Sequence, residues 1–237
     1  MDMQRELDRI LDALRAYKEE TACPGVVLGI SGGKDSTVVA MLSKIVFGDK
    51  VLGVLMPNGE QKDISDSLAI CEQLGLKHYV VNVKDAFDGL LSAIPVEVTA
   101  QAKTNIPPRL RMTTLYAIAQ TLGYRVIGTG NASESFIGWT TKWGDGAYDL
   151  NPIGSLTCSE VVAVGKLLAE RLGLDLSFVL KAPSDGLTGK TDEDNFGFTY
   201  AALDKYIRTG EGDAETVAKI ERMHKASAHK RTMPLKF

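Results

Sequence analysis

Residues 31–36, Ser-Gly-Gly-Lys-Asp-Ser, combine the groups that a phosphate-binding loop needs. Two glycines let the backbone approach an anion closely, and free N–H groups at the start of a helix point toward it. The loop follows an aliphatic run at 26–30 that is typical of a buried parallel strand, and helix-like apolar spacing begins at Thr37. A strand, a glycine-rich turn and a helix in this order indicate a phosphate cradle.

Two common phosphate loops do not fit this stretch. A Walker A loop needs a glycine five residues before its Gly-Lys pair, where Leu28 stands, and a Ser or Thr after the lysine, where Asp35 stands. The dinucleotide fingerprint GxGxxG fails because Gly29 and Gly32 are three residues apart. A plain strand-to-helix turn with an Asp or Ser cap is the structural alternative, but it does not need both glycines and both hydroxyls. The remaining pattern, SGGxDS, resembles the loop of the pyrophosphate-loop ATPases, which adenylate a substrate oxygen.

The elements that must position this loop alternate between strands and helices. Aliphatic runs predict parallel strands at 26–30, 51–56, 79–83 and 125–130, and helical spacing follows each of the first three. We therefore expect an α/β protein with a doubly wound, Rossmann-like, five-stranded parallel sheet of order 3-2-1-4-5. Helices should cover both faces, with a C-terminal helical extension. No linker divides the sequence, so we expect residues 1–237 to form a single domain.

Composition and charge narrow the class of protein. The 237 residues are 44% hydrophobic and 24% charged, and the net charge of −3 argues against a nucleic-acid partner. No apolar run approaches the ~20 residues of a membrane span, and the charged amphipathic segment at 1–20 lacks the apolar core of a signal peptide. The three cysteines are far apart and form no CxxC motif. We expect a cytoplasmic protein with reduced thiols that binds neither nucleic acid nor membrane.

Two carboxylates far apart in sequence could hold a metal ion beside the loop. Ligands of a doubly wound sheet lie at the carboxyl ends of the strands where the strand order reverses, here between the first and fourth strands. Asp35 follows the first strand and Glu134 follows the fourth. Mg²⁺ binds few protein oxygens and takes the rest from phosphate and water. By itself Glu134 could be an ordinary surface carboxylate, but beside the loop it favours a Mg²⁺ site with Asp35.

Five motifs, in order, make the chain resemble the ammonia-dependent NAD⁺ synthetases from about residue 5 to residue 234. They are GISGGKDS, RLRM at 109–112, GTGNASE at 128–134, TKWGDGAYDLNP at 141–152, and His-Lys-Arg at 229–231. That family adenylates the nicotinate carboxylate of deamido-NAD⁺ with ATP, and ammonia then attacks the acyl-adenylate to give NAD⁺, AMP and pyrophosphate. The resemblance implies ATP, deamido-NAD⁺ and ammonia as substrates, Mg²⁺ as the metal, and a homodimer.

The resemblance also implies roles for individual residues. ATP is expected to contact Gly29, Ile30, Ser31, Gly32, Gly33, Lys34, Asp35, Ser36, Thr129, Cys158 and Ser184. Deamido-NAD⁺ is expected to contact Arg109, Lys142, Asp149, His229 and Lys230. Asp35 and Glu134 would bind Mg²⁺, and the catalytic residues would be Lys34, Asp35 and Asp185, with Asp185 at the ammonia site. Taken singly, Arg109, Lys142 and His229 could be ordinary surface residues, and only the shared framework favours substrate contact.

The sequence departs from the family pattern at Cys158. Many family members carry a lysine there that contacts ATP, and a neutral thiol cannot supply that charge. Either Lys34 takes over this role or ATP is held with one cation fewer, and we favour Lys34.

Two polar stretches without periodicity, 136–151 and 181–197, are long enough to close over a bound substrate, and we expect them to act as lids.

Other functions on the same fold remain open. One is a different adenylating amidotransferase or a tRNA thiolase, although a thiolase would need paired reactive cysteines and a basic surface. A non-enzymatic ATP-binding regulatory module is the other, but it would have no use for the 139–151 loop or the terminal His-Lys pair.

Overall fold

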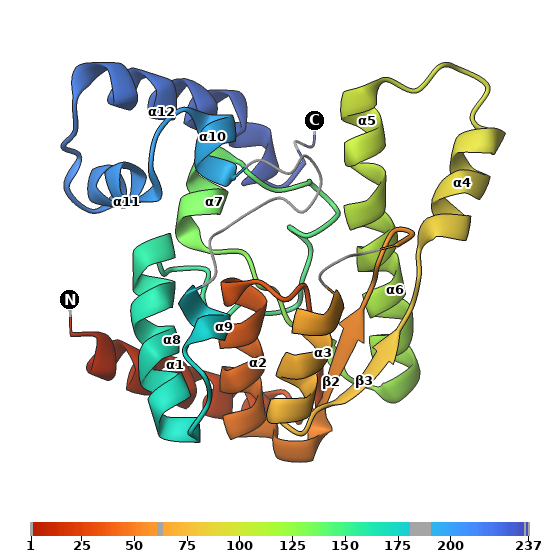
Figure 1. Ribbon diagram of the computed structural model, residues 1–237, viewed down its shortest axis with the longest axis vertical. Coiled ribbons are helices and arrows are strands. Elements are labelled where there is room, and N and C mark those ends of the chain that lie inside the picture. The colour runs from red at the N-terminus through yellow and green to blue at the C-terminus, as the bar shows by residue number, and fades with distance from the viewer. Residues whose placement is uncertain (1, 61–63, 181–190, 235, 237) are drawn as a thin grey trace.

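A parallel sheet with helices on both faces forms the centre of the protein (Figure 1). The computed structural model describes residues 2–60, 64–180, 191–234 and 236. Within these residues the sheet has four strands in the order β3-β2-β1-β4. The strands are β1 (Val26–Gly29), β2 (Val51–Leu55), β3 (Lys77–Val80) and β4 (Arg125–Val126). The expected α/β class and parallel sheet are confirmed, with β1 pairing in parallel with both β2 and β4.

The expected fifth strand, and with it the order 3-2-1-4-5, is wrong for the described chain. Where that strand would lie, the chain makes a single parallel bridge between Ile127 and Leu150. Two backbone hydrogen bonds flank the bridge, and then the chain turns because the Asn151 side chain accepts a bond from the Ile153 N–H at 3.2 Å. Pro152 has no N–H with which to continue a ladder. Pairing therefore stops after one bridge. The third and fourth strands also end earlier than their aliphatic runs, at residues 80 and 126.

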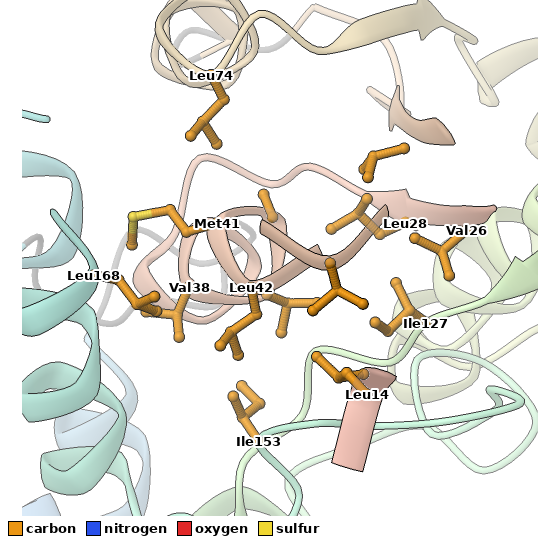
Figure 2. Close-up of a cluster of buried hydrophobic side chains, with 14 of the residues drawn as sticks. Leu14, Val26, Leu28, Val38, Met41, Leu42, Leu74, Ile127, Ile153 and Leu168 are labelled. Carbon is orange, nitrogen blue, oxygen red and sulfur yellow. The ribbon is translucent and has the colours of Figure 1, made fainter. Parts of the chain in front are cut away.

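One face of the sheet is covered by α1 (Met3–Glu20), α2 (Lys34–Phe47), α3 (Ile64–Gln73), α8 (Cys158–Leu172) and α9 (Ser177–Leu180). In Figure 2 the α2 side chains Val38, Met41 and Leu42 lie at the centre of this cluster, with Leu168 of α8 beside them. All four side chains are fully buried, and burying each contributes roughly 1.5–3 kcal/mol. This packing fixes α2, and therefore the loop at its N-terminus, against the sheet.

The opposite face is covered mainly by α6 (Ile106–Leu122), which carries prolines in its first turn, where a missing N–H costs nothing. Side chains alternate along β2, so Leu52 and Val54 face the cluster beneath α6 while Val51 and Leu55 face α2. The helices α4 (Lys84–Ala93) and α5 (Ala100–Thr104) precede α6 on this side of the molecule (Figure 1).

The expected C-terminal helical extension is present. It contains α10 (Asp192–Phe196), α11 (Tyr200–Thr209), α12 (Ala214–Ala226) and the 3₁₀ turn η2 (Ala228–Lys230), and it packs on α7 (Ala132–Ile137) through a third apolar cluster. A second 3₁₀ turn, η1 (Gly48–Lys50), joins α2 to β2. In the described part of the chain, no helix is long and apolar enough to cross a membrane.

Candidate active site

Hydrogen bonds involving its two serines, together with one left-handed glycine, shape the loop at residues 31–36. Gly32 has a φ of +79°, in the left-handed region that only glycine adopts freely. The Gly33 N–H donates to the Ser31 hydroxyl at 3.2 Å, and the Ser36 hydroxyl donates to the Gly33 carbonyl at 3.0 Å. Gly33 is the N-cap of α2 and provides no side-chain hydrogen bond to the helix. Among the described residues, no side chain caps the first N–H groups of α2, and these groups could bind phosphate oxygens.

A buried cation lies at the start of α2. The Lys34 side chain is 3% exposed, and its ammonium donates to Asp35 Oδ2 at 2.7 Å and lies 5.6 Å from the centre of the Tyr200 ring. Burial is the largest influence on the pKa of Lys34 and lowers it, but Asp35, Cys158 and Glu134 together raise that pKa above its ordinary value. The cradle therefore holds a permanent positive charge at neutral pH.

Asp35 and Glu134 meet where the strand order reverses, as the sequence predicts, and one asparagine joins them. The Asn131 side-chain amide donates to Asp35 Oδ1 at 3.1 Å, and the Asn131 backbone N–H donates to Glu134 Oε2 at 3.1 Å. The Glu134 N–H returns a bond to Asn131 Oδ1 at 3.0 Å, which completes a capping box for α7. Asn131 was not among the expected site residues, although its place within GTGNASE is the signal that could have identified it.

The two carboxylates fit a magnesium ion by their chemistry. Burial, and then the negative charge of Asp35, raise the pKa of Glu134 to about 8. A bound cation would offset both effects, and carboxylate oxygens are the ligands that Mg²⁺ prefers. Within the described ranges, no group of three or more His, Cys, Asp or Glu could hold a metal by itself. Ligation would therefore need phosphate oxygens as well.

Thr129 and Cys158 border the same region. Thr129 is half-buried in the turn between β4 and α7, and the carbonyl of the next residue, Gly130, accepts a bond from the Asn151 side chain at 2.8 Å. Cys158 is buried at the start of α8, where burial raises the pKa of its thiol to about 12, so it is neutral. Ser184 and Asp185 lie outside the described residues.

The basic residues expected to contact deamido-NAD⁺ gather around the loop at 138–143. Arg109 is exposed on α6 and its Nε donates to the Lys142 carbonyl at 3.3 Å. The Lys142 ammonium donates to the carbonyl of His229 and lies 5.4 Å from the centre of the Trp143 ring. Lys230 donates to the carbonyls of Gly138 and Thr140, at 2.8 and 2.7 Å, and burial lowers its pKa. These cations are thus hydrogen-bonded to backbone carbonyls.

Asp149 and Arg111 differ from this group in their contacts. Asp149 Oδ2 accepts the backbone N–H of Val126 at 2.8 Å, so its carboxylate closes the edge of the sheet where a fifth strand would lie. Arg111 donates to the Met56 carbonyl at 2.9 Å, and burial lowers its pKa. The two arginines of RLRM therefore have different surroundings. Arg109 is exposed, whereas Arg111 is hydrogen-bonded to the residue that follows β2.

Known proteins resemble this chain over almost its whole length. A family model described as NAD synthase matches residues 6–234. An NH₃-dependent NAD⁺ synthetase from Carboxydothermus hydrogenoformans is 44% identical over 240 residues, which cover 99% of this chain and 97% of the relative. The solved structure of an NMN synthetase from Francisella tularensis matches with a TM-score of 0.91 and 33% identity, covering 100% of this chain and 98% of that one. An NH₃-dependent NAD synthetase from Campylobacter jejuni matches with a TM-score of 0.81 and 31% identity, covering 100% and 99%. With its phosphate cradle at the switch point of the same fold, this chain belongs to the NAD synthase family.

Proposed function

We propose that the loop at 31–36 binds ATP, that the basic cluster around 138–143 binds deamido-NAD⁺, and that the reaction takes place between them. The chain is an ATP-dependent ligase that amidates deamido-NAD⁺ to NAD⁺ with ammonia, and this is supported by relatives that are named NH₃-dependent NAD⁺ synthetases. A tRNA thiolase and a regulatory module are not favoured. The observation that carries the residue assignment is the contact of Asn131 with both Asp35 and Glu134 beside the uncapped start of α2.

We propose that the reaction proceeds in two steps. A nicotinate carboxylate oxygen attacks the α-phosphorus of ATP, the bond to the β-phosphate bridging oxygen breaks, and pyrophosphate leaves. Ammonia then attacks the acyl carbon of the adenylate, its nitrogen loses one proton, and AMP leaves with the carboxylate oxygen. Lys34 and the N–H groups of α2 would stabilise the charge that develops on the phosphates. Mg²⁺ bound by Asp35 and Glu134 would neutralise the triphosphate and its departing pyrophosphate.

We further propose that Lys34 supplies the charge that a thiol at residue 158 cannot. Its support is the position of the buried Lys34 ammonium at the start of α2, close enough to Cys158 for the two groups to interact electrostatically. Replacing Lys34 by glutamine should raise the KM for ATP and lower kcat. Steady-state kinetics with ATP varied will measure both, and unchanged values would contradict this role.

We propose that residues 1–237 form a single catalytic domain and that two copies of the chain form a homodimer. The homodimer is supported by exposed apolar side chains at one edge of the sheet: Tyr79 and Val80 on β3 and Leu90 on α4. Among the described residues β3 pairs only with β2, so its outer edge is open to a second copy of the chain. All three cysteines are free and buried, which is compatible with a reducing, cytoplasmic environment. Sedimentation of the wild type and of Leu90→Asp will test the dimer, since the variant should sediment as a monomer. If the wild type is itself a monomer, the proposal is wrong.

Nicotinate mononucleotide is a second candidate substrate. The specific observation in its favour is the NMN synthetase structure, whose TM-score of 0.91 exceeds the 0.81 of the NAD synthetase from Campylobacter jejuni. Both substrates present the same carboxylate, and they differ only in the adenylate half that deamido-NAD⁺ adds.

One assay separates these functions. The protein is incubated with ATP, MgCl₂, ammonium chloride and either deamido-NAD⁺ or nicotinate mononucleotide, and AMP, pyrophosphate and amidated product are quantified. We expect AMP and NAD⁺ in equal amounts and a higher kcat/KM for deamido-NAD⁺. A higher kcat/KM for the mononucleotide would favour the second candidate. If no AMP is formed with either substrate, both candidates are rejected.

A further inference from the structure

A buried carboxylate outside the expected site joins the helix that carries Glu134 to the start of α8. Asp204 lies on α11 and is only 7% exposed. We infer that Asp204 is a positioning residue for the Asp35–Glu134 pair and that it acts through the hydroxyl of Ser133. This inference rests on the proposed function, because it assigns Asp204 a role in binding MgATP.

The Asp204 carboxylate receives a hydrogen bond from each of two elements. The Ser133 hydroxyl donates to Oδ1 at 2.5 Å, and the Ser159 backbone N–H donates to Oδ2 at 2.7 Å. The Ser133 oxygen in turn accepts the Cys158 N–H at 2.9 Å. One carboxylate and one hydroxyl therefore satisfy two of the N–H groups that the first turn of α8 leaves without helical partners. Ser133 is fully buried, so water cannot replace these bonds.

These contacts matter for the site because α7 has only six residues and cannot form a stable helix by itself. Its orientation depends on tertiary contacts, and α11 contacts both α7 and α8. Ser133 is the residue immediately before Glu134, and Asn131, which holds Asp35, is the N-cap of the same helix. A displacement of Ser133 would therefore move Glu134 and Asn131 together, relative to Asp35 on α2.

The chemistry of the contact requires a carboxylate. Both groups facing Asp204 are donors, and an ionised carboxylate offers acceptors to both. Asparagine has nearly the same shape, but it would turn an NH₂ group toward one of the donors. The asparagine variant therefore changes the hydrogen bonding around Ser133 while it keeps the packing of the side chain.

Glu160 is the matched control, because it also binds the start of α8 without reaching Ser133. Its Oε2 accepts the Thr157 N–H at 2.8 Å, and it forms an ion pair with Arg208. Both Asp204→Asn and Glu160→Gln should lower the midpoint of thermal unfolding. A merely structural role for Asp204 would produce the same functional phenotype in both variants.

The experiment measures Mg²⁺ dependence and ATP binding on the full chain. Calorimetry gives the Kd for ATP in the presence of Mg²⁺, and kinetics give the half-saturating Mg²⁺ concentration and the KM for deamido-NAD⁺. For Asp204→Asn we expect the Kd and the half-saturating Mg²⁺ each to rise about tenfold, the lower end for groups that orient metal ligands. The KM for deamido-NAD⁺ should change less than twofold. Glu160→Gln should leave all three within twofold of the wild type.

Ser133→Ala removes the same link from its other side and keeps the proposal testable if Asp204→Asn does not fold. It should reproduce the Mg²⁺ phenotype, and the double variant should be no worse than either single variant, because both substitutions break one connection. Additive effects, equal effects in Glu160→Gln, or an unchanged Mg²⁺ dependence in Asp204→Asn and Ser133→Ala would overturn the inference. Absence of amidation by the wild type would instead reject the proposed function.

Discussion

The proposed site has two halves, one for ATP and one for the dinucleotide, and they differ in how far the fold has already arranged their side chains. In the ATP half, Asp35 accepts hydrogen bonds from both Lys34 and Asn131, and the side chains of these two donors are buried. In the dinucleotide half, Arg109 is exposed and Lys142 is half-buried, and their donors bind carbonyl oxygens of the backbone. The ATP half is pre-organised by side-chain contacts, whereas the dinucleotide half has cations that a ligand carboxylate or phosphate could recruit.

The cause of this difference lies in the supporting elements. The loop at 31–36 stands on α2, whose apolar side chains are buried between the sheet and α8. The loop at 138–143 lies between α6 and the C-terminal turn, and Trp143 there adopts a φ of +61°, which is uncommon for a residue with a side chain. Substitutions in the ATP half should therefore cost stability and turnover together. Substitutions in the dinucleotide half should cost substrate affinity alone.

The largest effect is expected for Asp35→Ala. It removes a proposed Mg²⁺ ligand and leaves the Lys34 ammonium buried without its partner, so unfolding should become easier by about 3–5 kcal/mol. Turnover should fall at least on the order of 10²-fold. Chemical denaturation and steady-state kinetics measure the two effects. Asp12→Ala, which breaks an exposed pair with Arg15, should change stability by less than about 1 kcal/mol. If Asp35→Ala is as stable as the wild type, side-chain contacts do not pre-organise the ATP half.

A smaller effect on stability is expected for Gly32→Ala. A side chain at a φ of +79° costs about 1–2 kcal/mol, and its Cβ would lie 3.1 Å from Ser67 Oγ. Gly210 has a similar φ of +73° with open space around it, far from the loop in sequence. Gly210→Ala should show a similar loss of stability with normal ATP affinity, while Gly32→Ala should also weaken ATP binding. Equal ATP affinity in the two variants would place the phosphates elsewhere.

The dinucleotide half is tested by the two arginines of RLRM. Arg109→Ala should raise the KM for deamido-NAD⁺ about tenfold, because a hydrogen bond to a charged group is worth about 1.5–3 kcal/mol. Its stability should change by less than about 0.5 kcal/mol. Arg111→Ala should do the reverse, losing stability because the Met56 carbonyl loses its donor, with little change in KM. If both variants share one phenotype, the division between the halves is wrong.

A pH dependence of stability is also expected in the absence of divalent cations. Because the pKa of Glu134 in the folded protein, about 8, lies above its ordinary value of 4.5, the folded state binds this proton more tightly than the unfolded state. Stability from this group is complete below pH 4.5 and is lost as the pH rises toward 8. Thermal unfolding of Glu134→Gln should decline less steeply than that of the wild type over this range. Mg²⁺ with ATP should make the unfolding midpoint of the wild type less dependent on pH. If the midpoints of the wild type and of Glu134→Gln change with pH in parallel, the raised pKa is not that of Glu134.

The sequence predicts the position of the loop at 31–36 and of Asp35 and Glu134 because the signals for it are local. Aliphatic runs and a glycine-rich turn place the loop between β1 and α2, and parallel strands bring Glu134 to the same edge as Asp35. The sequence could not show that a single bridge replaces the fifth strand. An apolar residue such as Leu150 is expected in either case, whether it pairs alone or as part of a strand.

Polar contacts between distant parts of the chain could not be predicted from the sequence for a different reason. Asp204 stands in a helix whose other charges face solvent, so nothing local distinguishes a buried carboxylate from an exposed one. The bonds from Lys142 and Lys230 to backbone carbonyls likewise join segments about 90 residues apart in the chain, and no periodicity encodes them.

The fate of one oxygen atom tests the central claim that this chain activates a carboxylate by adenylation. Deamido-NAD⁺ labelled with ¹⁸O in its nicotinate carboxylate is turned over with ATP, Mg²⁺ and ammonium, and the products are analysed by mass spectrometry. Attack on the α-phosphorus followed by amide formation transfers one labelled oxygen to AMP, so we expect singly labelled AMP in amounts equal to NAD⁺. Label in pyrophosphate or inorganic phosphate, or unlabelled AMP formed alongside NAD⁺, would contradict the account.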